Sequence, residues 1–353
     1  MLRIAMISTP FIPVPPRDYG GTELVVHELV EGLLDRGHDV TLFATGDSRT
    51  RARLRALYDE PIWPPETFAE LDHVSWAMQQ VAQGSYDVVH AHAPAALAIG
   101  RLVPDVPVVY TIHHHHEPAL SRYYAGFPQA DYVAISAHQC RRESGVDWCA
   151  VIHHGLDPSP YRWSERPEPY VCFVGRLAPE KGPATAIEVA ARAGVPLRMA
   201  GSIHPVDKAY VEAEVLPRLD APGVTYLGPI GMDRKVPLLC AARALLAPIE
   251  WNEPFGLILI EAMLSGCPVV AFGRGSVPEL VDHGETGFVV ESLEEMADVI
   301  RVGGPVERLN RARIRELAVR RFNRNRMVAD YERVYQRAVA RTRRSSLRPI
   351  TAA

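Results

Sequence analysis

Short apolar runs alternate with segments of helical periodicity along most of the chain. In the first half, apolar runs occupy residues 4–7, 40–43, 88–91, 108–111, 132–135 and 150–152. Residues 22–34 show apolar positions at helical spacing, and Gly37 ends that segment. Continuously apolar strands separated by helices are typical of a parallel sheet covered on both faces. The pattern therefore predicts an α/β fold with a doubly wound sheet.

A second series of the same kind predicts a second doubly wound sheet. Its apolar runs occupy residues 170–174, 197–200, 224–227, 244–247 and 269–272. The intervening segment is rich in proline, polar and without a period, which predicts a linker at about 158–168. A length of 353 residues also suits two domains. We expect domains at 1–158 and 168–325, with ligands bound in the cleft between them.

A long helical pattern extends from residue 311 to about 341. It is rich in arginine and carries four apolar or aromatic residues on one face, Met327, Tyr331, Val334 and Tyr335. The simplest interpretation is a solvated helix that docks through this apolar stripe. Transient contact with a membrane surface is the alternative, because four arginines lie near its end: Arg337, Arg341, Arg343 and Arg344.

Composition excludes several classes of protein. A net charge of −4 gives no general attraction to nucleic acid. Five scattered cysteines predict reduced thiols and a cytoplasmic location rather than a disulfide framework. The apolar start is too short for a signal peptide. No run approaches the ~18 apolar residues of a membrane span.

Two glutamates eight positions apart are the first candidates for chemistry. Glu253 lies in a turn with Pro254 and Gly256, whereas Glu261 lies in an apolar run that predicts a short helix. A buried carboxylate is costly unless it is hydrogen-bonded, so Glu261 requires a partner, and hydroxyls of a sugar or ribose would serve. A glutamate near the positive end of a helix is the ordinary alternative.

Two cations follow the first strand of the second series, within residues 175–182. Arg176 and Lys181 stand beside Gly175 and Gly182 at the carboxyl end of that strand. Fixed cations of this kind neutralise the charge that develops on a departing diphosphate. A surface loop of salt bridges is the alternative.

Two glycine-rich turns precede helices. Gly20 and Gly21 follow the first strand, and residues 273–276 form a similar turn. Backbone N–H groups at such turns can bind anions, although simple tight turns are the alternative. Neither turn is a G-x-G-x-x-G fingerprint or a P-loop, which disfavours a dehydrogenase.

Four consecutive histidines, residues 113–116, follow the strand at 108–112. Adjacent side chains point in different directions and the usual zinc spacings are missing, so we predict no metal site. One histidine at the carboxyl end of the strand suits hydrogen bonding or acid/base chemistry. A histidine that only packs at the start of a loop is the alternative.

Together these motifs resemble the retaining glycosyltransferases of family 4, which use nucleotide sugars and have the GT-B architecture. The motifs occur in order: G-R-x-x-x-x-K-G, E-P-F-G-L-x-x-x-E-A-M-x-x-G, P-E-L-V and T-G-F-V. The resemblance covers almost the whole chain. It implies two Rossmann-like domains facing across a cleft, with a final helix at about 328–345 crossing back to the first.

The resemblance also implies an activity. A sugar would pass from a UDP-, GDP- or related nucleoside-diphosphate donor to a hydroxyl of a lipid, polysaccharide or small molecule. The anomeric configuration would be retained without a protein nucleophile, a cofactor or an obligatory metal, because orientation and charge stabilisation suffice. The alternatives are a nucleotide-sugar epimerase or hydrolase, and a non-catalytic nucleotide-sugar-binding module.

Site residues follow from the same resemblance. Arg176 and Lys181, beside Gly175, would hold the diphosphate; Glu253 would face the donor sugar and Glu261 the ribose. The backbone of Phe255, Gly256 and Leu257 would line the pocket. In the first domain, the implied contacts are Gly20 and Gly21 near the phosphates and acceptor, Ser136 facing the cleft, and His113 on the donor sugar. Many relatives have His-Asp where this chain has His113-His114, so His114 is the second choice.

Overall fold

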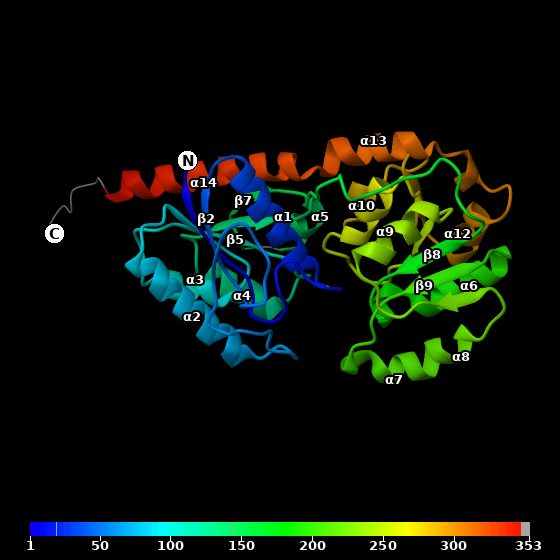
Figure 1. Cartoon of the computed structure of the whole chain (residues 1–353), viewed down its shortest axis with the longest axis horizontal. Coiled ribbons are helices and arrows are strands. Elements are labelled where there is room, and N and C mark those ends of the chain that lie inside the picture. Colours follow the sequence, from blue (N-terminus) through cyan, green and yellow to red (C-terminus); the bar gives the residue numbers. More distant parts are fainter. Residues whose placement is uncertain (19, 144, 347–353) are drawn as a thin grey trace. The chain divides into compact units, whose positions relative to one another are not determined.

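A computed structural model describes residues 1–18, 20–143 and 145–346, and the chain divides into two units (Figure 1). Unit 1 comprises residues 1–156 together with the segment that begins at Arg324. Unit 2 comprises Asp157–Asn323. The chain therefore leaves the first unit once and returns to it near its end. No helix within the described ranges is both long and apolar enough to cross a membrane.

Unit 1 is built on a seven-stranded parallel sheet of order β3-β2-β1-β4-β5-β6-β7. The strands are β1 (Arg3–Ile7), β2 (Asp39–Phe43), β3 (Arg53–Arg55), β4 (Val88–Ala91), β5 (Val108–Thr111), β6 (Asp131–Ala134) and β7 (Trp148–Val151). The helices are α1 (Gly21–Asp35), α2 (Thr67–Gln83), α3 (Ala95–Gly100), α4 (Pro118–Ala125), α5 (Ala137–Arg142) and α14 (Arg324–Ser346). The predicted doubly wound sheet is confirmed, except that β3 was missed because its arginines break any apolar run.

Successive side chains of β4 and β5 point to opposite faces of this sheet. Val89 and Tyr110 join a core with α2 and α3. Their neighbours His90 and Thr111 point the other way, where they bond to tyrosines of α14. The alternation follows from the pleat of a strand, which turns successive side chains to opposite faces. The face towards α2 and α3 is therefore mainly apolar, and the other carries a buried polar network.

Helix α14, red in Figure 1, docks on unit 1 through the stripe that the sequence predicts. Met327, Tyr331 and Tyr335 are fully buried, and Val334 is nearly so. Gly32 of α1 permits a close approach, because a Cβ there would lie 2.5 Å from Val328 Cγ2. The single helix expected at 311–341 is wrong. Asn323 has extended backbone angles (φ −72°, ψ 138°), so α13 (Arg311–Phe322) ends in unit 2 before α14 begins.

Unit 2 is built on a six-stranded parallel sheet of order β10-β9-β8-β11-β12-β13. The strands are β8 (Val171–Val174), β9 (Leu197–Ala200), β10 (Val224–Tyr226), β11 (Leu245–Ala247), β12 (Val269–Phe272) and β13 (Gly287–Val290). The helices besides α13 are α6 (Pro183–Ala193), α7 (Lys208–Tyr210), α8 (Leu216–Leu219), α9 (Met232–Ala241), α10 (Leu257–Leu264), α11 (Val277–Leu280) and α12 (Leu293–Ile300). One core joins the strands to α6 and α12. The second predicted sheet is confirmed, with β13 as an addition.

The segment expected to be a linker is a packed part of unit 2. Tyr161 is buried, and its hydroxyl donates to Glu261 Oε1 at 3.1 Å. Arginines of α13 bond its carbonyl groups: Arg311 Nε donates to Ser164 O at 2.7 Å and Arg315 to Pro158 O at 3.2 Å. Prolines remove backbone donors, so side chains from elsewhere satisfy the remaining carbonyls. The segment expected as a linker therefore begins at the boundary between the units and packs within unit 2.

Candidate functional site

The loop after β8 is held by glycine at two close approaches. A Cβ on Gly201, which follows β9, would lie 1.7 Å from Gly175 O, so the two loops are in backbone contact. Gly182 adopts φ 69° and its Cβ would lie 2.2 Å from Pro248 O. Only glycine fits such contacts without a shift of the backbone. The segment that carries Arg176 and Lys181 is therefore fixed at the carboxyl ends of β8 and β11.

Both cations of this loop are paired with carboxylates. Arg176 contacts Glu180, and its Nε lies 3.4 Å from Asp207 Oδ2. Lys181 Nζ contacts Glu253 Oε2. Arg176 Nε and Asp207 Oδ2 are buried without a hydrogen-bond partner among the described residues. The salt bridges foreseen as the alternative thus exist, but the pairing of Arg176 with Asp207 is incomplete.

Glu253 is a buried side chain whose two oxygens differ. Oε2 receives hydrogen bonds from Lys181 Nζ and from Trp251 Nε1, the latter at 2.8 Å. Lys181 Nζ also lies 5.0 Å from the centroid of the Trp251 ring. Oε1 accepts no hydrogen bond within the part of the chain that the structure describes. Trp251 was not predicted: its proximity to Glu253 in sequence does not by itself show that the indole reaches Oε2.

The second glycine-rich turn supports the Glu253 turn. Ser276 donates from its backbone N to Glu253 O at 2.9 Å and from its hydroxyl to Phe255 O at 2.7 Å. A Cβ on Gly275, which adopts φ 61°, would lie 2.3 Å from both N and O of Glu253. Gly256, at φ 85°, then turns the chain into α10. Residues 273–276 therefore hold a neighbouring loop in place.

Glu261 has partners from within the protein. It lies on α10, as predicted, and its Oε1 is 2.6 Å from Lys235 Nζ of α9 and accepts from the Tyr161 hydroxyl. Oε2 accepts no hydrogen bond from the described residues. The requirement for a partner was correct, but sugar hydroxyls are not needed to meet it. In each glutamate of the pair, one carboxylate oxygen is bonded to side chains of the protein and the other accepts no hydrogen bond from the described residues.

In unit 1, Gly20 and Gly21 open α1 after β1. A Cβ on Gly20 would come within 2.9 Å of Glu23 Oε2, so the buried Glu23 side chain lies against the turn. Thr9 Oγ1 donates to Glu23 Oε1 at 3.0 Å, and burial raises the pKa of Glu23. The predicted glycine turn is present, with a carboxyl group at its side.

Adjacent histidines of the 113–116 run point to different neighbours. His113 Nε2 lies 2.8 Å from His92 Nδ1, and the ring stacks on His154 with 5.4 Å between centroids. His114 instead contacts Tyr124, and His116 contacts Glu143. Burial lowers the pKa of His113 to about 3, so the imidazole is neutral at physiological pH. Among the described residues, no group of three or more His, Cys, Asp or Glu is arranged to hold a metal ion.

Ser136 and Gln139 organise the loops around His113. Ser136 is fully buried and caps α5 by accepting from Gln139 N at 3.1 Å. The Gln139 amide donates to Ile112 O and His114 O, the carbonyls on either side of His113. Gln139 was not predicted, because its contacts link separate loops. The observed role of Ser136 is to start a helix.

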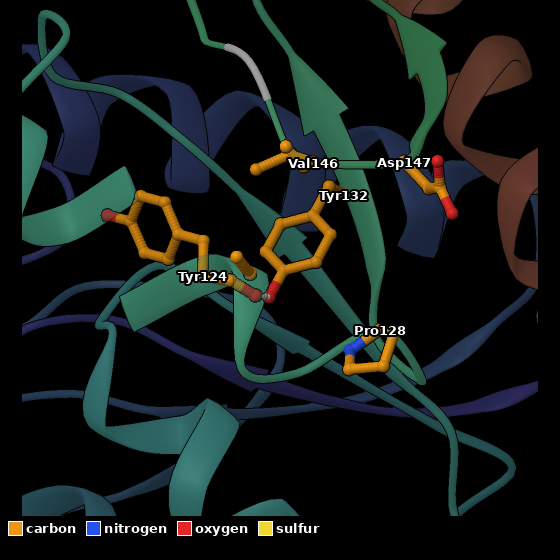
Figure 2. Close-up of a pocket in the computed structure, with 7 residues that line it drawn as sticks. Tyr124, Pro128, Tyr132, Val146 and Asp147 are labelled. Atoms are coloured by element: carbon orange, nitrogen blue, oxygen red, sulfur yellow. Dashed lines mark hydrogen bonds between the residues drawn. The ribbon is translucent and has the colours of Figure 1, made fainter. Parts of the chain in front are cut away.

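A cavity of about 190 Å³ lies elsewhere in unit 1 (Figure 2). Tyr124, Pro128, Tyr132, Val146 and Asp147 line it, and the Tyr132 hydroxyl donates to Tyr124 O at 2.8 Å. No candidate site residue is among the described residues that line it. We therefore do not assign it to the site.

Known proteins resemble this chain in sequence and in fold. Residues 19–160 match the family model Glycosyltransferase Family 4, and residues 162–301 match Glycosyl transferases group 1. A D-inositol 3-phosphate glycosyltransferase of Nocardioides sp. is 27% identical over 85% of this chain and 81% of its own. AviGT4, a glycosyltransferase involved in avilamycin A biosynthesis, is 26% identical with a TM-score of 0.73, covering 96% of this chain and 98% of that chain. Anabaena Alr3699/HepE, solved with UDP and glucose, has a TM-score of 0.75 at 21% identity, covering 96% and 100%.

Two parallel doubly wound sheets, the second carrying cations and glutamates at the carboxyl ends of its strands, define a glycosyltransferase of the GT-B architecture. With both family models matched in order along the chain, this protein belongs to glycosyltransferase family 4. The resemblance found in the sequence is confirmed.

Proposed function

We propose that this glycosyltransferase takes its sugar from a nucleoside-diphosphate donor and transfers it to a hydroxyl acceptor with retention of the anomeric configuration. The observation that carries the proposal is the direct contact of Lys181 with Glu253, beside Arg176, in unit 2. A cation for phosphate and a carboxylate for sugar hydroxyls thus stand side by side. The Anabaena protein with this fold was solved with UDP and glucose, which supports a donor of the UDP-sugar type.

The paired charges suit exchange with a diphosphate. Arg176 Nε has no hydrogen-bond acceptor among the described residues, so a phosphate oxygen would satisfy it. Helix geometry leaves the N–H groups of Leu257 and Ile258, the first two of α10, without an acceptor inside the helix, and such groups favour an anion. These groups would neutralise the leaving diphosphate without an obligatory metal.

The carboxylate oxygens without a hydrogen bond suit the sugar and ribose hydroxyls of the donor. Glu253 Oε1 would accept from hydroxyls of the sugar, and Glu261 Oε2 from hydroxyls of the ribose. Lys181 and Lys235 hold the opposite oxygen of each group and so fix its orientation. The two glutamates act as donor-binding groups in this proposal, and neither is a nucleophile.

The transfer needs no covalent enzyme intermediate. The bond from the anomeric carbon to the diphosphate breaks to give a short-lived oxocarbenium-like ion pair. The acceptor oxygen then bonds to the same face of that carbon, and its proton passes to the leaving phosphate oxygen. The protein supplies orientation and charge stabilisation.

Turnover of alanine variants tests the proposal. A thermal-shift panel of UDP-, GDP-, ADP- and TDP-sugars first identifies the donor, because a ligand of the folded state raises Tm. Arg176→Ala and Lys181→Ala should each lower kcat by roughly 100- to 1,000-fold, as for other groups that stabilise developing charge. Lys208→Ala is the matched control, since Lys208 is exposed in the same unit. Near-normal turnover in both site variants would refute the proposal.

The same assay separates the competing functions. Free sugar released without dependence on an acceptor indicates a hydrolase, and an inverted sugar nucleotide indicates an epimerase. Donor binding without turnover across many acceptors indicates a binding module.

We also propose a cytoplasmic location for this protein, which its five free cysteines support. Transient membrane contact through α14 is secondary, because Arg341 makes two hydrogen bonds to Asp131 at 2.7 and 2.6 Å, and Arg343 lies 3.4 Å from Asp87. Such pairing reduces the positive charge that anionic lipids would attract. Co-sedimentation with anionic and with neutral vesicles tests the contact.

A further inference from the structure

Three side chains of unit 1, Met6, His92 and His113, form a hydrogen-bonded relay that ends at His113. Met6 lies on β1, His92 follows β4, and His113 follows β5. Met6 Sδ is 3.2 Å from His92 Nε2, and His92 Nδ1 is 2.8 Å from His113 Nε2. Both nitrogens of His92 are thus engaged, one by a sulfur and one by another imidazole.

The sulfur sets the direction of the first hydrogen bond. A thioether has no proton and can only accept, so His92 Nε2 must donate to Met6 Sδ. A neutral imidazole carries a single N–H, which leaves a lone pair on Nδ1 of His92. His92 is buried, and burial holds its pKa well below the ordinary value, so the neutral form applies.

The second hydrogen bond follows from the first. His92 Nδ1 can only accept, so His113 Nε2 carries the proton and donates to it. His113 is neutral as well, and its Nδ1 therefore carries a lone pair. Nδ1 has no hydrogen-bond partner in the described part of the chain. The stack on His154 and the Gln139 contacts to residues 112 and 114 hold the ring in place.

The neighbouring His90 does not compete for these bonds. Its Nδ1 lies 2.7 Å from the Tyr335 hydroxyl and its Nε2 lies 2.8 Å from Thr111 Oγ1. The His90 ring packs on His92 with 4.3 Å between centroids. The His90 ring therefore helps to bury His92 but is not part of the hydrogen-bonded relay.

We propose that Met6 and His92 are positioning residues that hold His113 in the Nε2–H tautomer, so that Nδ1 is left to accept a hydrogen bond from a hydroxyl group of a substrate. The identity of the ligand as a substrate of sugar transfer rests on the proposed function, whereas the tautomer does not. A lone pair at this point favours a hydroxyl and repels an oxygen that can only accept. A substrate that directs a carboxylate or carbonyl oxygen at His113 Nδ1 is therefore disfavoured.

Nitrogen NMR of the intact protein tests the tautomer directly. Long-range ¹H–¹⁵N correlations of histidine-labelled protein distinguish protonated from unprotonated ring nitrogens, and the His113→Gln variant assigns the signal. We expect His113 with protonated Nε2 and unprotonated Nδ1. The opposite tautomer in the wild-type protein would overturn the proposal whatever the enzymatic activity.

Variants of Met6 and His92 test the hydrogen-bonded relay. Met6→Leu and His92→Leu should give His113 a mixture of tautomers, because each removes an acceptor. His92→Asn should restore the wild-type pattern, since its amide oxygen can accept where Nδ1 did. Met78→Leu is the matched control, because Met78 is buried on α2 in the opposite core. An unchanged His113 spectrum in folded Met6→Leu and His92→Leu would contradict the relay.

Kinetics test the ligand separately. His92→Leu should raise KM for one substrate, donor or acceptor, by roughly two- to tenfold, the effect of one hydrogen bond, with a smaller change in kcat. His92→Asn should recover most of it. A confirmed tautomer with KM unchanged for both donor and acceptor in His92→Leu would refute the contact with a substrate hydroxyl, while the Arg176 and Lys181 variants still report on transfer itself.

Discussion

Unit 1 should lose stability between pH 7.5 and pH 5 because His90 is buried in a neutral form. His90 is fully buried, and burial lowers its pKa from 6.5 to about 3. The unfolded chain therefore takes up a proton first as the pH falls. The stabilising contribution is complete above the unfolded pKa and is lost progressively from pH 6.5 towards pH 3.

The magnitude follows from the two pKa values. Each pH unit within this window costs about 1.4 kcal/mol of unfolding free energy per histidine. At pH 5 the loss from His90 is therefore about 2 kcal/mol. Burial also lowers the pKa values of His92, His113 and His154, which adds loss of the same sign. Glu23 acts in the opposite sense, because its raised pKa favours the folded state at low pH.

Hydrogen exchange of peptides from β4 and β5 reports unit 1 separately from unit 2. The comparison is between wild type and His90→Gln, which keeps an amide towards Thr111 but cannot titrate. The loss of opening free energy from pH 7.5 to 5 should be about 2 kcal/mol smaller in the variant. His115→Gln, at an exposed histidine, is the control and should follow the wild type. Equal losses in wild type and His90→Gln would refute the reasoning.

Two substitutions near Glu253 give further predictions. Gly275→Ala should displace the Glu253 turn and lower kcat/KM by roughly 10-fold or more, because its Cβ would lie 2.3 Å from the Glu253 backbone. Gly284→Ala is its control: φ is 81° there, but nothing lies within 4 Å, so it should lose about 1 kcal/mol of stability and keep its activity. Equal activity in the two variants would contradict this role. Trp251→Phe removes the hydrogen bond to Glu253 Oε2 and should lower kcat/KM roughly 5-fold. Trp163→Phe, in the same unit, is the control and should keep the wild-type kcat/KM. Steady-state kinetics with the identified donor measure both variants, and an equal kcat/KM in the two would contradict the role of Trp251.

The sequence predicted most elements because their apolar patterns are local. Both sheets and the helix that carries Glu261 follow from runs of a few residues. Strand β3 has no such run. The packing of the segment at 158–168 could not be predicted, because its partners Arg311 and Arg315 lie far along the chain. A helical period also continues across Asn323, where the backbone becomes extended.

For the site, the sequence identified candidate charged residues but not how their side chains are held. Lys181 and Glu253 were both named, yet their contact spans 72 positions. Tyr161, Lys235 and Trp251 gave no comparable motif, because their role depends on which carboxylate oxygen they reach. His92 was missed for a related reason: the direction of its hydrogen bond depends on a methionine of another strand.

The return of α14 to unit 1 has a consequence for synthesis on the ribosome. All seven strands of unit 1 emerge before unit 2 begins, but the helix that covers one face of their sheet emerges last. Until then, His90 and Thr111 lack the hydroxyls of Tyr335 and Tyr331. Unit 2 is continuous and can complete its fold earlier, which reverses the usual N-terminal-first order. A nascent chain that has emerged from the ribosome only as far as Asn323 would therefore hold a finished second unit and an unfinished first one.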